Sequence, residues 1–315
     1  MVTGIFAGVA WALETVVIGI ALSTSAFGIS PEVVFLAPFI ATFLHDALSA
    51  VYMLIYNAVR GRLGGLLSVI RSPSFKWLAL ASAVGGPIGM TGYVMAVMYM
   101  GASVGAVASA VYPAVGTALA CIFLKERVRL YRWIFLLFTL LGVYGLGYSP
   151  TLELESFWLG LLGAFMCAFG WGIEAVILAR CLKDGSLVGE YALSIRQAVS
   201  AVVYGAILLP VLGGLRPMGD VLSHGEVGTL LLLVAAAALF ATASYLLYYR
   251  TIGRLGAAKA MALNITYTAW AIVFTVILLG DTSVLNPLTL VCALVIVVCG
   301  ILAATDMKSL GLKKN

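Results

Sequence analysis

Residues 2–24 read VTGIFAGVAWALETVVIGIALST, and residues 156–180 read SFWLGLLGAFMCAFGWGIEAVILAR. Each stretch is long and apolar enough to cross a membrane as a helix, which takes about 20 apolar residues. Each also carries a Trp three residues before a Glu: Trp11 with Glu14, and Trp171 with Glu174. Residues three apart lie on the same face of a helix. The two stretches therefore predict a membrane protein that presents an indole and a carboxylate together, twice.

The composition of the whole chain agrees with this interpretation. Of 315 residues, 63% are hydrophobic and 10% are charged, which is typical of integral membrane proteins. Ten apolar stretches could span or nearly span a bilayer: about 2–24, 32–57, 76–99, 101–124, 130–149, 156–180, 187–212, 227–250, 256–279 and 285–305. The sequence therefore predicts an all-α membrane protein with ten transmembrane helices.

The basic residues set the expected orientation. If both termini lie in the cytoplasm, 16 of the 18 Lys and Arg residues fall in cytoplasmic loops or tails, as the positive-inside rule requires. The two exceptions are Arg216 and Arg196, and Arg196 lies within a predicted helix. The net charge of +5 follows from this bias and does not indicate nucleic-acid binding.

The two halves of the chain share further residues at a regular spacing. Ser109 and Tyr112 are followed 155 residues later by Asn264 and Tyr267. We therefore expect two repeats of five helices each, residues 1–149 and 150–315. Because five is odd, the second repeat would be inverted in the membrane. Inverted repeats place the substrate near the bilayer midplane, at the interface between the halves.

Ionisable side chains inside predicted helices mark the candidate site: Glu14, His45, Asp46, Glu174 and Arg196. A charged group at the bilayer centre costs about 2.5–3.5 kcal/mol on insertion scales and usually faces a partner or a cavity. Arg196 could be a structural counter-ion, and His45 could be a hydrogen-bonded interior residue. The three carboxylates are candidates for cation binding or for proton exchange.

Aromatic residues within predicted helices give a second indication: Tyr112, Tyr245, Tyr248, Tyr249, Tyr267 and Trp270. Such rows usually serve packing or the membrane interface. Ring faces beside buried carboxylates also bind organic cations, at about 0.5–2 kcal/mol per good contact. The convergence of both features favours a site for an organic cation.

Together these residues resemble the drug/metabolite transporter superfamily of EamA-like ten-helix proteins, and more narrowly the bacterial choline importers. The matching stretches span nearly the whole chain: His45-Asp46, Gly86-Pro87-Ile88-Gly89-Met90, Val111-Tyr112-Pro113-Ala114, Trp171 with Glu174, Ile195-Arg196-Gln197, Ser244-Tyr245 with Tyr248, and Asn264 with Tyr267 and Trp270. In two of these stretches Pro interrupts a helix, which serves either packing or a hinge.

The resemblance implies a secondary transporter of a bacterial-type inner membrane that moves a choline-like quaternary ammonium ion with protons as the coupling ion. The expected substrate-binding residues are Trp11, Glu14, Tyr112, Trp171, Glu174, Tyr245, Tyr248, Asn264, Tyr267 and Trp270. We expect His45, Asp46, Arg196 and Gln197 to serve coupling or charge balance, with pH sensing at Asp46 and substrate charge at Glu174. Glu14 departs from the resemblance, which predicts a small or apolar residue there.

Several alternatives remain open on the sequence alone. The protein could export amino acids, metabolites or toxic cations, because the direction of transport is not encoded in these motifs. It could transport a metal ion on Glu14, His45, Asp46 and Glu174, or act as a receptor or scaffold. The chain lacks phosphate-binding glycine loops and HExxH or GxSxG motifs. We therefore expect no enzymatic activity, no resident metal and no cofactor.

Overall fold

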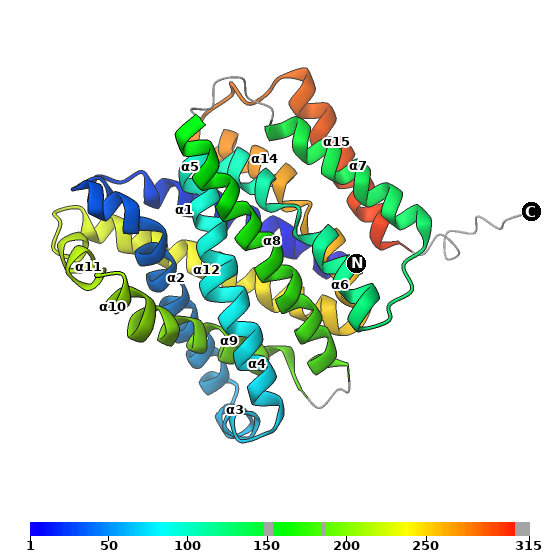
Figure 1. Cartoon of the computed structure of the whole chain (residues 1–315), viewed down its shortest axis with the longest axis horizontal. Helices are drawn as coiled ribbons and strands as arrows, with labels where there is room; N and C mark the ends of the chain where they lie inside the picture. Colours follow the sequence, from blue (N-terminus) through cyan, green and yellow to red (C-terminus); the bar gives the residue numbers. More distant parts are fainter. Residues whose placement is uncertain (148–153, 184–186, 306–315) are drawn as a thin grey trace, which may run out of the picture.

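The computed structural model describes residues 1–147, 154–183 and 187–305, and these ranges are helical and contain no strand (Figure 1). Eight helical segments have the length and composition to cross a membrane. Two shorter apolar helices, Tyr112–Phe123 and Leu130–Gly145, correspond to the fourth and fifth predicted segments. The all-α, multi-pass class is confirmed, and ten transmembrane helices remain a prediction.

The helices of the first half follow one another with short connections. They are α1 (Val2–Leu22), the short 3-10 helix η1 (Ser25–Phe27), α2 (Pro31–Val59), α3 (Leu63–Ile70), α4 (Ser74–Ala83), the π-helical η2 (Val84–Met90), α5 (Thr91–Ser109), α6 (Tyr112–Phe123) and α7 (Leu130–Gly147).

The helices of the second half include the longest of the molecule. They are α8 (Leu154–Leu182), α9 (Gly189–Val203), the π-helical η3 (Tyr204–Leu208), α10 (Leu209–Val211), α11 (Leu215–Leu222), α12 (Val227–Leu255), α13 (Ala257–Asn264), α14 (Tyr267–Leu279) and α15 (Pro287–Ala304).

Local sequence explains where several helices begin. The side chains of Ser30 and Asn286 accept hydrogen bonds from the backbone amides of Val33 and Thr289, at 3.2 and 3.0 Å, and each is followed by a Pro. A capping oxygen satisfies a free amide of the first turn, where Pro is also tolerated.

One predicted boundary is wrong. The sequence separates two segments near residue 100, but α5 continues to Ser109, and the next helix begins at Tyr112. Pro113 explains the later break, because Pro fits the first turn of a helix and disrupts its interior.

Helices of the first half pack mainly on helices of the second half. α1 packs along α12, α5 along α8, α2 along α9, α6 along α13, and α7 along α15. The α7–α15 pair lies side by side at one edge of the molecule in Figure 1. The largest buried apolar cluster draws on both halves, so the core lies between them.

The glycine-rich segment η2 is a point of close approach between the halves. A Cβ added to Gly85 would meet the Glu174 side chain, and one added to Gly89 would meet Trp171. Tyr204 donates a hydrogen bond to the Pro87 carbonyl at 3.2 Å and also contacts Thr91. The glycines therefore give α8 and α9 room to bring polar and aromatic side chains against this segment.

Candidate functional site

A buried cavity lies where α1, α6, α8, α12 and α13 meet. Its lining residues come from both halves of the chain: Trp11, Tyr112, Trp171, Glu174, Ala175, Ser244, Tyr245, Tyr248 and Asn264. Seven of these are among the ten substrate-binding residues predicted from the sequence. The structure thus gathers positions up to 253 residues apart around one space.

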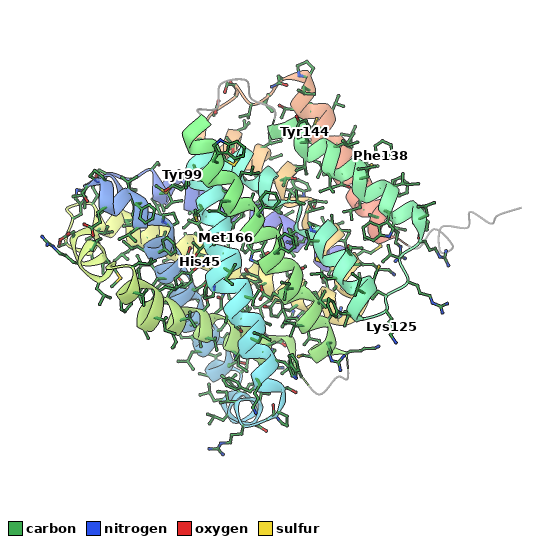
Figure 2. The ribbon with its side chains drawn as sticks, in the orientation of Figure 1. His45, Tyr99, Lys125, Phe138, Tyr144 and Met166 are labelled. Atoms are coloured by element: carbon green, nitrogen blue, oxygen red, sulfur yellow. The ribbon has the colours of Figure 1, made fainter. Side chains whose placement is uncertain are left out.

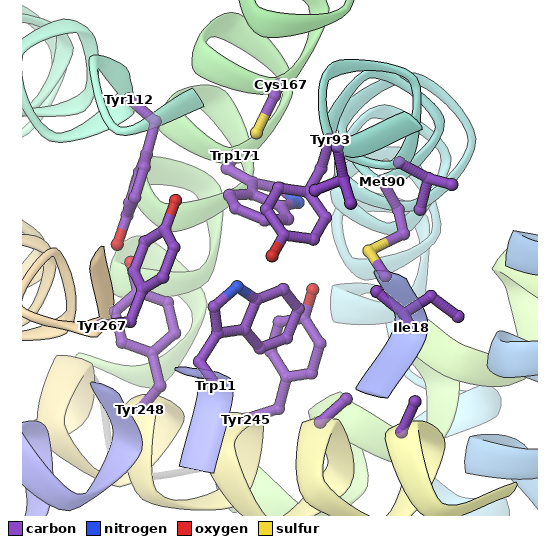
Figure 3. Packing of buried hydrophobic residues seen from close by; sticks show 14 of the residues in the cluster. Trp11, Ile18, Met90, Tyr93, Tyr112, Cys167, Trp171, Tyr245, Tyr248 and Tyr267 are labelled. Carbon is purple, nitrogen blue, oxygen red and sulfur yellow. The ribbon is translucent and has the colours of Figure 1, made fainter. Parts of the chain in front are cut away.

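The aromatic rings of the cavity pack edge to face, as Figure 3 shows. The ring centre of Trp11 lies 5.2 Å from that of Trp171 at 85°, and 5.1 Å from that of Tyr245 at 75°. Tyr112 meets Trp171 at 5.5 Å and 89°. The free space between the rings is about 20 Å³, which is enough for one water molecule. An organic cation therefore enters only if these rings or their helices move apart.

Glu174 supplies the charge of the cavity. Among the described residues it is the only acidic or basic one in the lining, and its surface is 4% exposed. Its Oε1 accepts a hydrogen bond from the Tyr249 hydroxyl at 2.7 Å and lies 3.4 Å from Nε of Arg196. The carboxylate is thus fixed at the cavity wall by two donors from different helices.

Arg196 lies just behind this wall with all three of its nitrogen atoms engaged. Nη1 lies 3.2 Å from Asp46 Oδ2 and 2.6 Å from Gln197 Oε1. Nη2 donates to the Tyr245 hydroxyl at 2.9 Å and to the Gly85 carbonyl at 3.3 Å. The guanidinium also stands 4.6 Å from the centre of the Tyr245 ring, a distance typical of a cation–π contact. All of its N–H donors are thus taken up by groups of the protein, among them the carboxylates of Asp46 and Glu174.

Asp46 and His45 continue this network away from the cavity, and Figure 2 labels His45 within the helix bundle. Besides Arg196, Asp46 accepts from Ser200 Oγ at 2.5 Å and from His45 Nδ1 at 2.9 Å. The other ring nitrogen of His45 lies 3.9 Å from Glu14 Oε1. Glu14, although predicted to bind substrate, is not among the residues that line the cavity.

The remaining predicted residues lie near the cavity but outside its lining. Tyr267 is fully buried close to Tyr112 and Tyr248 (Figure 3), and Trp270 packs against the edge of the main apolar cluster. Their helix, α14, begins three residues after Asn264, whose amide donates to the Tyr112 hydroxyl at 2.9 Å.

Two residues beside the cavity were not among the predicted site residues. The ring of Tyr93 lies 5.6 Å from that of Trp11 and 5.1 Å from that of Trp171, and Tyr249 holds Glu174. The sequence contains a signal for both. The spacing of 155 residues aligns Tyr93 with Tyr248, and Tyr249 directly follows Tyr248.

The metal-transport alternative receives no support from this geometry. Within the described ranges, no three His, Cys, Asp or Glu side chains are grouped so that they could hold a metal ion. The neighbouring carboxylates are instead engaged by Arg196, Ser200 and Tyr249.

Comparison with known proteins shows what the chain resembles. The model of the EamA-like transporter family matches residues 1–148. This part of the chain is therefore similar to the EamA-like transporters. Protein LicB of Haemophilus influenzae is 29% identical to this chain over 218 residues, which cover 69% of this chain and 71% of that protein. The expected resemblance is therefore confirmed at the level of the family.

A known crystal structure extends the likeness in fold to the rest of the chain. It superimposes with a TM-score of 0.68 at 21% sequence identity and covers 96% of both chains. The likeness in fold therefore extends beyond the region that the family model matches.

Proposed function

We propose that this protein is an EamA-like transporter that moves a choline-like quaternary ammonium ion, or a related organic cation, by alternating access with protons as the coupling ion. One observation carries the proposal. Five aromatic side chains and one carboxylate, from both halves of the chain, surround a single buried cavity. A quaternary ammonium group has no hydrogen-bond donor, so ring faces and a nearby negative charge are the groups that bind it.

Unpartnered polar atoms of the lining support a substrate that also carries a hydroxyl group. The indole nitrogens of Trp11 and Trp171, the Tyr248 hydroxyl and the Asn264 side-chain oxygen are buried and have no hydrogen-bond partner in the structure. Leaving buried polar groups unpaired is costly. A hydroxyl group on the substrate would pair with at least one of them, as the hydroxyl of choline can.

The saturation of Arg196 argues against a zwitterionic substrate such as an amino acid. An amino acid needs a cation for its carboxylate, and the guanidinium of Arg196 is already shared among five groups of the protein. It also does not line the cavity. The cavity therefore favours a substrate that is positively charged overall.

The packing of the helices supports alternating access between two halves. Each major interface pairs a helix of residues 1–149 with a helix of residues 150–315, as two inverted five-helix repeats with cytoplasmic termini would. The cavity lies between these halves and is nearly filled by its own rings. We infer that this is a closed conformation, and that rocking of the halves opens the site.

Three ligands of similar size test the proposal: choline, tetramethylammonium and 3,3-dimethylbutanol, which has the shape of choline without its charge. Isothermal titration of the purified wild-type protein should rank choline first, tetramethylammonium second and the neutral alcohol last. We expect choline to bind at least about tenfold more tightly than the alcohol, which corresponds to about 1.4 kcal/mol. Equal affinity for choline and the alcohol, or no binding of either cation, would reject an organic-cation site.

A further inference from the structure

Glu14 is a buried carboxyl group that the cation cavity does not use. It is 0% exposed, and within the described ranges neither of its oxygens meets a donor at hydrogen-bond distance. The hydroxyl of the neighbouring Tyr93 is hydrogen-bonded to Thr15. Glu174, in contrast, has both Tyr249 and Arg196 within reach. Removing an ionised carboxylate from water without such partners costs far more than removing the neutral acid. In this conformation Glu14 therefore carries a proton.

His45 presents the group that can take this proton. Asp46 is held by Arg196 and Ser200 and acts as an acceptor, so Nδ1 of His45 carries the hydrogen that it donates to Asp46. A neutral imidazole has only one N–H. The Nε2 atom is then bare, and it is this atom that lies 3.9 Å from Glu14 Oε1. A carboxylic acid thus faces a vacant imidazole nitrogen.

We propose that Glu14 and His45 form the proton-binding site of this transporter, separate from the cation cavity; the coupling role of this site rests on the function proposed above. A small approach lets the proton pass between them. The O–H bond of Glu14 breaks and an N–H bond forms at Nε2 of His45, which leaves a carboxylate opposite an imidazolium. The Nδ1 hydrogen continues to donate to Asp46.

The other titratable groups around Glu14 cannot replace His45 in this exchange. The neighbours from all the elements packed around it are His45 and Asp46 of α2, Tyr93 of α5, Tyr245 of α12 and Tyr267 of α14. Phenols ordinarily keep their protons until about pH 10. Asp46 is already occupied by three donors.

The sequence similarity between the two halves supports the same separation of a proton site from a cation site. Leu48-Ser49-Ala50-Val51 is matched 151 residues later by Val199-Ser200-Ala201-Val202, and the same spacing aligns His45 with Arg196. Glu14 with His45 in one half thus corresponds to Glu174 with Arg196 in the other. Arginine stays charged at every physiological pH, whereas histidine titrates near neutrality. One half therefore places a guanidinium beside its carboxyl group, and the other an imidazole.

The charges around Glu14 and Glu174 explain why both the proton and the organic cation are needed. With Glu14 protonated and His45 neutral, the remaining charges are the carboxylates of Asp46 and Glu174 and the guanidinium of Arg196. Their sum is one negative charge, which a single organic cation neutralises. A buried site favours zero net charge. The proton on Glu14 and the organic cation beside Glu174 together bring the net charge of these residues to zero.

Infrared spectroscopy tests the proton site without any substrate. Purified wild-type protein in lipid nanodiscs at neutral pH should show the carbonyl stretch of a protonated carboxylic acid. The Glu14→Gln variant should lack this band, and Glu32→Gln should keep it, because Glu32 is exposed at the start of α2. A Glu14→Gln spectrum identical to that of the wild type would overturn the assignment.

Transport by reconstituted protein tests the coupling. We expect Glu14→Gln and His45→Gln to bind choline within about threefold of the wild type and to exchange internal for external choline. Both should lose at least about tenfold of the accumulation that a pH gradient drives. A Glu14→Gln protein that accumulates choline normally, or that is folded but no longer binds it, contradicts the proposal. If the wild type binds no organic cation, the proposed function fails, and the infrared result still decides where the proton lies.

Discussion

The two Trp-x-x-Glu segments have the same local pattern but different surroundings. In α8, Trp171 and Glu174 both line the cavity, and the carboxylate is held by Tyr249 and Arg196. In α1, only Trp11 reaches the cavity, and Glu14 faces His45 outside it. The helical spacing of an indole and a carboxylate is therefore not enough to make a cation site. The neighbouring helix decides, by placing a guanidinium or an imidazole beside the carboxyl group.

The most direct test of this difference between the two segments is to neutralise each glutamate in turn. Glu174→Gln should weaken choline binding by at least about 100-fold, or about 2.7 kcal/mol. It removes the one carboxylate that the described residues contribute to the cavity lining and leaves the Arg196 charge less compensated, and unpairing a buried ion is costly. Glu14→Gln should change affinity by no more than about threefold. Titration calorimetry on both variants makes the measurement, and equal losses would show that the two segments are equivalent.

A substitution in η2 tests whether the position of Glu174, and not only its charge, matters. A Cβ at Gly85 would displace the Glu174 side chain from Arg196 and Tyr249. Gly85→Ala should therefore cost about 1–3 kcal/mol in choline affinity or stability, the usual range for overpacking. Gly228→Ala is the matched control, because nothing lies within 4 Å of an added Cβ there. If binding and melting temperature stay unchanged in Gly85→Ala, the close approach at η2 has no role.

Substitution of either indole should weaken choline binding to the same extent, whereas substitutions of the two glutamates should differ in their effect. Trp11→Ala and Trp171→Ala should each weaken choline binding by about 1–2 kcal/mol, and the Phe variants should lose less because a ring face remains. Trp77→Ala, on the exposed side of α4, should bind as the wild type does. Calorimetry that finds an effect for only one of the two indoles would confine the cation to one half of the cavity.

The smallest expected difference separates two adjacent tyrosines. Tyr249 donates to the Glu174 carboxylate at 2.7 Å, whereas the Tyr248 hydroxyl has no partner in the structure. Tyr249→Phe should weaken choline binding by about 1 kcal/mol, through the lost hydrogen bond to a charged group. Tyr248→Phe should leave the affinity for tetramethylammonium, which has no hydroxyl, unchanged. If Tyr248→Phe loses more affinity for tetramethylammonium than Tyr249→Phe does, Glu174 is not oriented by Tyr249.

Much of the site was predictable because polar residues are easily recognised within apolar membrane-spanning segments. Polar residues are costly inside apolar segments, so Glu174, Arg196 and Asp46 stood out. The aromatics Tyr112 and Tyr245 were found through their spacing and the resemblance, and the structure places both at the cavity. The boundary near residue 100 was missed because hydropathy does not distinguish one long helix from two short ones.

The sequence by itself determined the all-helical membrane class, the faces on which Trp11, Glu14, Trp171 and Glu174 lie, and the family resemblance. These properties depend on local composition and on the 3.6-residue period of the helix. Only the tertiary structure decided that Arg196 is saturated, that Glu174 lines the cavity and that Glu14 faces His45. These facts depend on which distant helices pack together, and a helix face carries no local record of the neighbour it will meet.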